Sequence, residues 1–297
     1  MNALRLAATN AYAQFRQQID ETDGFMNGQD GSNRARRPGR ARGTAIGVLS
    51  ALTMVSAAFA VDPKPDAIIK NRNIEARVLL NSKVKADPAL SADCLAEGRK
   101  WIERNAAEAA AARKQNPQFF QNGGWDFERK YAVRSVAADR YVSVVRADYM
   151  NTNGAHPNSD VNTILWDKTD VKRISIRPFF AETADSGPTM KAMLKGVIAS
   201  LKVEKRKRDA GETATSEWFR DIQPSLLKIG AVTLAPSTEA GKSSGLTFHY
   251  PPYAVGPYAE GGYVAFVPWE TLKPYLSPEG ARIFAGARPK GDEDDAQ

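Results

Sequence analysis

Hydrophobic and polar residues follow two different periods along the chain, which predicts separate groups of helices and strands. From Ser91 to Gln115 apolar residues recur at helical spacing among many alanines, with Ser91 as the capping residue. A second helix is predicted over residues 188–208, because Pro188 suits a first turn and cations crowd the C-terminal end. Its apolar face consists of Met190, Met193, Leu194, Val197, Ile198 and Leu201.

Runs rich in Val, Ile, Tyr and Phe predict the strands. Residues 125–137 and 140–150 form a predicted β-hairpin, with Ala138 and Asp139 at its turn. The other predicted strands are 74–80, 161–166, 231–235, 246–250 and 262–267, and shorter helices are expected at 215–222, 268–276 and 277–284. Because strands and helices do not alternate strictly, the pattern favours an α+β fold with an antiparallel or mixed sheet and helices packed on one face.

The N-terminal part has the features of an export signal. Five arginines between Arg34 and Arg42 precede an uncharged apolar run from Thr44 to Phe59. A small-x-small site follows, and this order is typical of a secretory signal peptide with cleavage near Ala60. The apolar run is short for a membrane-spanning helix, which needs about 20 residues, so an uncleaved anchor is the alternative.

The rest of the chain is expected to form one domain. Residues 1–60 are the N-terminal extension and signal, 61–72 a tether, 73–286 a single α+β domain, and 287–297 an acidic disordered tail. Two subdomains that meet near residues 160–170 are the alternative arrangement. The 33 residues before the signal have two explanations: the translation start is assigned too far upstream, or these residues form a genuine cytosolic tail. No span is expected in the mature chain, which we expect to be extracytoplasmic, in the periplasm.

Charge and cysteine content narrow the function classes. The net charge is +7, and residues 1–60 contribute 7 − 4 = +3, which leaves +4 for the mature chain. This mild excess fits a protein near anionic glycans or membranes and does not indicate a nucleic-acid partner. The single cysteine, Cys94, allows no internal disulfide and no cysteine-based metal site, and its position predicts a buried, unreactive thiol.

Catalytic motifs are missing from the sequence. There is no nucleophile elbow, HExxH motif, P-loop or GxGxxG motif after a strand. The two histidines could join Asp148, Asp160 or Glu260 in a metal site, but the close local spacing of zinc ligands is absent. We therefore assign no catalytic residue, metal or cofactor. A glycan hydrolase that uses carboxylates brought together by the fold stays open as the alternative.

Two loops contain the candidates for ligand binding. Residues 154–158 combine a flexible glycine, a rigid proline and side chains that bond to backbone. Residues 249–263 contain four tyrosines, which offer large contact areas at low entropic cost. The candidate ligand-binding residues are His156, Asn158, His249, Tyr253, Tyr258 and Glu260. Alternatively, His156 ties a strand to a turn, and the tyrosine-rich loop is a corner packed on the sheet. We expect the two loops to be neighbours.

These loops, in this order, resemble a family of secreted bacterial domains of unknown function, found as the C-terminal extracytoplasmic domain of the anti-sigma factor RsiV and of the peptidoglycan deacetylase PdaC. The matching residues are Tyr149, Gly154 to Asn158, Thr163, Asp167, Phe179, Phe180, Phe248, Tyr253, Gly256 to Ala259 and Gly261. The chain departs from the pattern at Asn153, where glycine is usual, although asparagine tolerates a left-handed conformation. The resemblance covers roughly residues 70–285.

The resemblance implies a role in the bacterial cell envelope. The RsiV-like domain is a receptor for lysozyme, and the PdaC-like domain accompanies an enzyme that acts on wall glycan. The resemblance does not extend to the regulatory domain of RsiV or to the deacetylase domain of PdaC. We therefore expect a non-catalytic binding module whose partner is peptidoglycan or a wall-acting enzyme such as lysozyme. A purely structural role for both loops is a further alternative, and oligomeric state is left open.

Overall fold

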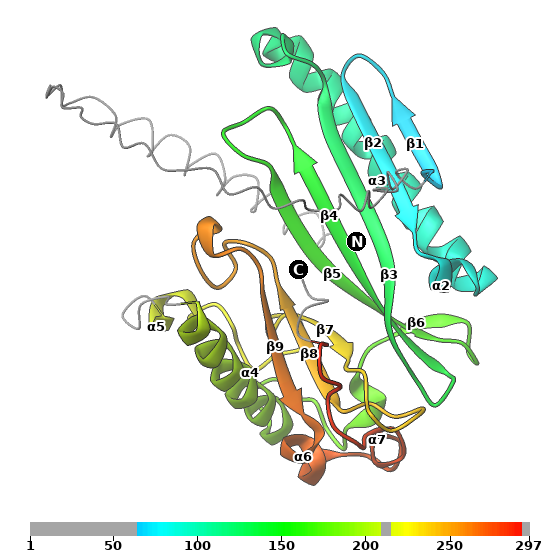
Figure 1. The fold of residues 1–297 in the computed structure, drawn as a ribbon, viewed down its shortest axis with the longest axis vertical. Helices are drawn as coiled ribbons and strands as arrows, with labels where there is room; N and C mark the ends of the chain where they lie inside the picture. The colour runs from blue at the N-terminus through cyan, green and yellow to red at the C-terminus, as the bar shows by residue number, and fades with distance from the viewer. Residues whose placement is uncertain (1–63, 209–214, 293–297) are drawn as a thin grey trace, which may run out of the picture. The chain divides into compact units, whose positions relative to one another are not determined.

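The computed structural model of the protein describes residues 64–208 and 215–292 (Figure 1). The predicted signal at 34–60, the residues before it, and residues 293–297 of the predicted tail lie outside this description. Within the described ranges, no helix has both the length and the apolar character needed to cross a bilayer. The predicted α+β class is confirmed, with a six-stranded mixed sheet and a second, three-stranded sheet.

The six-stranded sheet follows the order of the sequence. Its strands are β1 (Ala67–Lys70), β2 (Ile74–Leu80), β3 (Trp125–Ala137), β4 (Tyr141–Asn151), β5 (Asn158–Asp167) and β6 (Lys172–Ile174). Only β2 and β3 are parallel, and α2 (Ser82–Lys85), α3 (Pro88–Gln115) and η1 (Pro117–Phe120) connect them. The β3–β4 hairpin turns at Ala138 and Asp139 as predicted, and both have a φ of 52°, as primed hairpin turns require.

The three-stranded sheet and the remaining helices form the second part of the fold. Its antiparallel strands are β7 (Ala231–Leu234), β8 (Gly245–Tyr250) and β9 (Tyr263–Pro268). The helices are α4 (Pro188–Lys207), α5 (Thr215–Trp218), α6 (Trp269–Leu272) and α7 (Pro278–Ile283), with 3-10 turns η2 (Arg177–Phe179), η4 (Tyr258–Glu260) and η5 (Lys273–Tyr275). Figure 1 shows α4 lying along β9 and α3 along the β1–β3 side of the larger sheet. Each sheet therefore has its own long helix.

The first core lies between α3 and the larger sheet. Its main members are Ile74, Val78, Leu90, Cys94, Trp101, Ile102, Phe127, Tyr131, Val142, Val144, Ile164 and Trp166. Cys94 is buried as predicted, and burial raises the pKa of its thiol to about 12. The prediction that Ser91 caps α3 was wrong, because the Asp87 side chain accepts hydrogen bonds from the backbone N–H groups of Ala89 and Leu90.

The second core lies between α4 and the smaller sheet. The predicted apolar face of α4 is confirmed, with Met190, Met193, Val197 and Leu201 fully buried against Leu246, Phe248, Ala265 and Val267. Leu165 of β5 belongs to this core, whereas its neighbours Ile164 and Trp166 belong to the first. Because side chains of a strand alternate between faces, β5 separates the two cores at residues 164–166.

Two segments expected outside the domain are part of it. Residues 67–70 of the expected tether form β1, which pairs with β2 from Ala67–Val78 to Lys70–Glu75. In the expected tail, Asp292 is buried and accepts charged hydrogen bonds from Arg134 and Arg288. The tether and tail predictions are corrected to this extent. Backbone pairing orders the first segment and long-range ion pairs order the second, and neither is evident from local composition.

Candidate functional site

The turn between β4 and β5 presents His156. Asn153 has a φ of 64°, the left-handed conformation expected where the family pattern has glycine. Its side-chain amide donates to the carbonyl oxygens of Phe119 (3.1 Å) and Gly123 (3.3 Å), and its own N–H donates to the side chain of Asn151. The turn is therefore tied to the loop that precedes β3.

The predicted contact between the two loops is present. His156 Nδ1 lies 3.0 Å from the carbonyl oxygen of Pro157, and His156 Nε2 lies 3.2 Å from the hydroxyl of Tyr253. Only a protonated Nδ1 can bond to a carbonyl, so Nε2 accepts from the tyrosine in this tautomer. The imidazole stacks on Tyr258 with ring centroids 3.9 Å apart, and the Tyr258 hydroxyl donates to the Pro157 oxygen at 2.9 Å.

Tyr253 is the exposed member of this aromatic cluster, which we define as His156, Tyr253 and Tyr258. Its side chain is 44% exposed and its φ is 70°, a conformation that costs a non-glycine residue on the order of 1 kcal/mol. The hydrogen bond to His156 and the proximity of Tyr258, with ring centroids 5.5 Å apart, hold the ring at the loop tip. The cluster thus combines a structural bridge with an accessible aromatic face.

Glu260 anchors the tyrosine-rich loop to α4. It accepts hydrogen bonds from the ammonium of Lys205 (2.8 Å) and from the hydroxyl of Tyr263. Partial burial alone would raise the pKa of Glu260, but these two donors and the charges of Lys205 and Arg208 outweigh it and lower the pKa. The Arg208 guanidinium lies 4.0 Å from the centroid of the Tyr263 ring and donates to the carbonyl oxygens of Glu260 and Gly262. The carboxylate of Glu260 is therefore already bound by other residues of the protein, Lys205 and Tyr263.

The other two candidates lie apart from the aromatic cluster. His249 is buried on β8, with Nε2 3.0 Å from the hydroxyl of Thr233. Desolvation, with smaller contributions from the charges of Arg134 and Arg288, lowers its pKa to about 4. Asn158 is half-buried and begins β5 opposite Met150. Of the six candidates, the structure brings His156, Tyr253 and Tyr258 into mutual contact.

A groove of about 1150 Å³ lies beside this cluster, between the larger sheet and the 249–264 segment. Its floor is the face of β3–β5 turned away from α3, and includes Ala132, Val145, Ala147, Tyr149, Ser159 and Val161. Its opposite wall includes Pro251 and Pro252, which directly precede Tyr253. Sequence reasoning missed the floor; the signal for it is the presence of Ala and Val at both alternating positions of β3–β5.

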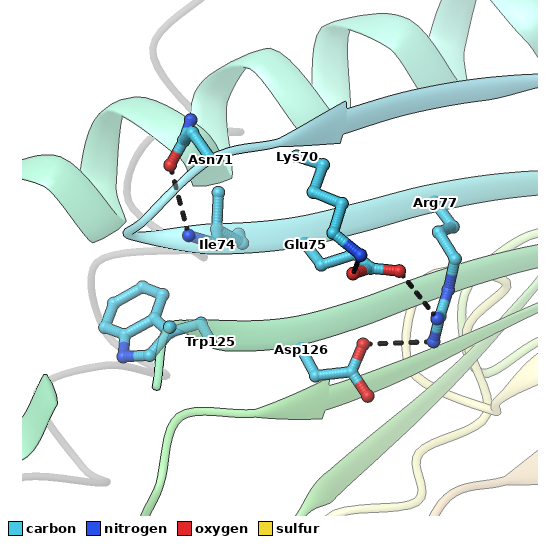
Figure 2. Close-up of a pocket in the computed structure, with 8 residues that line it drawn as sticks. Lys70, Asn71, Ile74, Glu75, Arg77, Trp125 and Asp126 are labelled. Atoms are coloured by element: carbon cyan, nitrogen blue, oxygen red, sulfur yellow. Dashed lines mark hydrogen bonds and ion pairs between the residues drawn. The ribbon is translucent and has the colours of Figure 1, made fainter. Parts of the chain in front are cut away.

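A smaller pocket of about 290 Å³ lies where the turn between β1 and β2 meets the start of β3 (Figure 2). Arg77 bridges Glu75 (3.1 Å) and Asp126 (3.0 Å), and Lys70 pairs with Glu75 on its other side. Neighbouring strands supply both signs of charge, so these groups satisfy one another. The pocket therefore leaves fewer charged groups available to a ligand than the groove does.

Two of the three carboxylates considered for a metal site, Asp148 and Glu260, are engaged in ion pairs. Asp148 forms a buried two-pronged ion pair with Arg129, whose guanidinium lies 4.4 Å from the Trp101 ring centroid. Glu260 is bound to Lys205. In the part of the chain that the structure describes, no three His, Cys, Asp or Glu side chains are grouped so that they could hold a metal ion.

Comparison with known proteins identifies a domain in the C-terminal half. The profile of a family described as "Protein of unknown function (DUF3298)" matches residues 192–270, which include most of α4 and all of β7–β9. Residues 192–270 are therefore similar to this family, whose function is unknown. No curated protein matches the chain.

Two solved structures of DUF3298 proteins are similar to the chain. A family member from Bacteroides fragilis NCTC 9343 has 15% identity and a TM-score of 0.44, over 64% of this chain and 72% of that one. A family protein from Pseudomonas aeruginosa PAO1 has 15% identity and a TM-score of 0.43, over 75% of this chain and 92% of that one. Neither comparison names RsiV or PdaC, so that finer resemblance stays a prediction.

Proposed function

We propose that the protein is a non-catalytic binding module of the bacterial cell envelope and that its ligand is peptidoglycan. The observation that carries this proposal is the aromatic cluster beside an open groove. Tyr253 exposes an aromatic ring at the tip of a loop that Glu260 and His156 hold in place. The apolar face of a sugar ring packs on such a ring, while the tyrosine hydroxyl stays available for hydrogen bonds.

The proposed location rests on the sequence of the N-terminal part. The arginine cluster and apolar run of residues 34–60 have the order of a secretory signal. We place the mature protein in the periplasm, after cleavage near Ala60. The mild positive charge of the mature chain suits a surface that meets anionic wall polymers.

Co-sedimentation of the purified protein with sacculi tests this function. We expect direct sedimentation, and we expect Tyr253→Ala to weaken it about tenfold while the domain stays folded, because a central aromatic contact is lost. Tyr258→Phe keeps the ring that stacks on His156 and should keep binding. Leu227→Ala is the control for loss of an exposed apolar side chain, because Leu227 is 95% exposed.

The other outcomes separate the alternatives. Sedimentation only after lysozyme is added would replace peptidoglycan with a wall-acting enzyme as the partner. Release of soluble fragments from labelled sacculi would show a glycan hydrolase instead. Equal sedimentation of the wild-type protein and Tyr253→Ala would remove the aromatic cluster from the binding site.

A further inference from the structure

The floor of the groove is an apolar surface on the uncovered face of the larger sheet. Its centre consists of Ala132, Val145, Ala147 and Val161; both alanines are exposed and both valines are half-buried. By strand alternation, the opposite face of the same strands carries the first core under α3. Pro251, Pro252 and Val264 add apolar surface from the opposite wall. Small aliphatic side chains thus line the centre of the groove floor.

Most charged groups around the groove already have partners. Glu128 pairs with Lys130 at 2.6 Å, Arg134 with Asp292, and Glu260 with Lys205. Asp160 lies opposite Asp148 and shares its side of the sheet, which is the side of α3. Its carboxylate therefore points away from the floor by strand alternation.

Two cations that line the groove form no salt bridge with a carboxylate of the described residues. Lys83 of α2 lines the groove and forms no ion pair there. Arg208 lines it from the end of α4. Among the described residues its guanidinium donates to two backbone carbonyl oxygens and covers the Tyr263 ring, and its charge also helps to lower the pKa of the nearby Glu260. The two charges come from the two parts of the fold, so together they fit a ligand that carries more than one anionic group.

We propose that the groove binds a short acidic peptide with small aliphatic side chains. Its side chains would pack on Ala132, Ala147 and Val161, and its carboxylates would pair with Lys83 and Arg208. The hydroxyls of Tyr149 and Ser159, which line the same floor, are placed to bond with peptide amides. The inference assigns the peptide part of peptidoglycan to the groove, and it therefore rests on the proposed function.

The floor favours a peptide over the two nearest alternatives. A sugar chain is held by aromatic faces and many polar groups, whereas the centre of this floor is aliphatic. An alkyl chain with one anionic head needs a narrow apolar slot and one cation. The open groove, the two separated cations and the hydroxyls together match an extended peptide with two carboxylates.

Isothermal titration calorimetry on the full chain with acetyl-Ala-Glu-Ala-Ala, which carries two carboxylates, tests the proposal. We expect measurable binding that weakens with added salt, because exposed charges are screened. Lys83→Glu should weaken binding about fivefold or more, as reversal of one exposed ion pair allows. Lys202→Glu is the matched control, since Lys202 is exposed on α4 and does not line the groove.

A second variant and a second peptide keep the test independent of Lys83. Ala147→Glu places a bulky anion on the floor and should abolish binding, while the exposed position tolerates it in the fold. The neutral peptide acetyl-Ala-Gln-Ala-Ala-amide should bind at least tenfold more weakly. Equal binding of both peptides, or unchanged binding by Lys83→Glu and Ala147→Glu, would overturn the proposal.

Parallel sedimentation with intact sacculi and with glycan strands stripped of peptide separates this inference from the proposed function. Sedimentation with both, together with no peptide titration, would overturn the groove assignment and leave wall binding in place. Peptide binding blocked by Ala147→Glu, without sedimentation on either polymer, would support the groove and overturn peptidoglycan as the ligand. Absence of all three signals would overturn both.

Discussion

At the scale of single residues, the two histidines have different tasks. His156 lies near the surface, where Nδ1 bonds within its own loop to Pro157 and Nε2 bonds across to Tyr253 of the second loop. His249 is buried in the smaller sheet and bonds to Thr233. The described residues show no contact between the two, so they do not form a common site. The burial of His249 leads to a direct prediction about the stability of the fold at low pH.

Protonation of His249 is expected to destabilise the fold. Its pKa is about 4 in the folded state and 6.5 in the unfolded reference, so the unfolded state binds more protons between these values. The stabilising contribution is complete above pH 6.5 and is lost as the pH falls toward 4, by about 3 kcal/mol. Urea unfolding of the wild-type protein and His249→Gln from pH 7 to 4 measures it. Glutamine cannot gain this charge, so parallel pH profiles would contradict the prediction.

The ion pair between Lys205 and Glu260 is the second residue-scale prediction. Lys205 is 2% exposed, so Glu260→Gln leaves an ammonium group buried without its counter-charge. We expect unfolding free energy to fall by about 2 kcal/mol, less than for a fully buried pair because Glu260 is partly exposed. Lys205→Met with Glu260→Gln removes both charges and should recover much of the loss. Additive losses in this double-mutant cycle would show that the two groups act independently.

At the scale of elements, each long helix approaches its sheet at a glycine. A Cβ added to Gly98 of α3 would lie 2.7 Å from a methyl group of Val78, and one added to Gly196 of α4 would lie 2.8 Å from a methyl group of Val267. Both valines are fully buried and have no room to move aside. The glycines therefore set how closely the helices pack on β2 and β9.

Gly196→Ala is expected to destabilise the protein despite the higher helix propensity of alanine. Propensity favours alanine by about 1 kcal/mol, while overpacking of a dense core costs about 1–3 kcal/mol, so we expect a net loss of about 1 kcal/mol. In a Val267→Ala background the added methyl group has space and should stabilise relative to that background. Thermal unfolding of the wild-type protein, the two single variants and the double variant measures this, and stabilisation by Gly196→Ala alone would contradict it.

Sequence patterns predicted the elements better than their ends and partners. The hairpin and α4 were predictable because long periodic segments and a local turn define them. Strand β1 was missed because four residues next to prolines and polar residues carry no period; it forms by pairing with β2. The burial of Asp292 depends on Arg134, far away in the chain, which local composition does not reveal.

The candidate site was predictable in part, where local sequence defines it. Turn chemistry and tyrosine content singled out His156, Tyr253 and Tyr258, which do meet. Alanine and valine at both alternating positions of β3–β5 show that both faces of the strands are apolar, but they do not show which face is covered by a core and which lines the groove. Glu260 was singled out by its position in the loop, and only the fold shows that Lys205 satisfies it.

At the scale of the whole molecule, side-chain hydroxyls join the two sheets. The N–H groups of Val232 and Leu234 point outward from the edge strand β7, and they donate to the hydroxyls of Thr163 (3.1 Å) and Ser143 (3.0 Å). The Ser135 hydroxyl donates to the carbonyl oxygen of Leu234 at 2.5 Å. The larger sheet thus covers an edge that would otherwise be free to pair with another chain.

This junction should make the two sheets unfold together. Ser143 is fully buried, and Ser143→Ala leaves the Leu234 N–H without an acceptor, which costs about 1–3 kcal/mol. We expect one cooperative transition in the wild-type protein and faster hydrogen exchange at Leu234 in the variant. Ser159→Ala is the control, because Ser159 lies on the same face of the sheet but is exposed. If Leu234 exchange stays unchanged in Ser143→Ala while the smaller sheet unfolds separately, β7 is held by apolar packing alone and the hydroxyls do not couple the sheets.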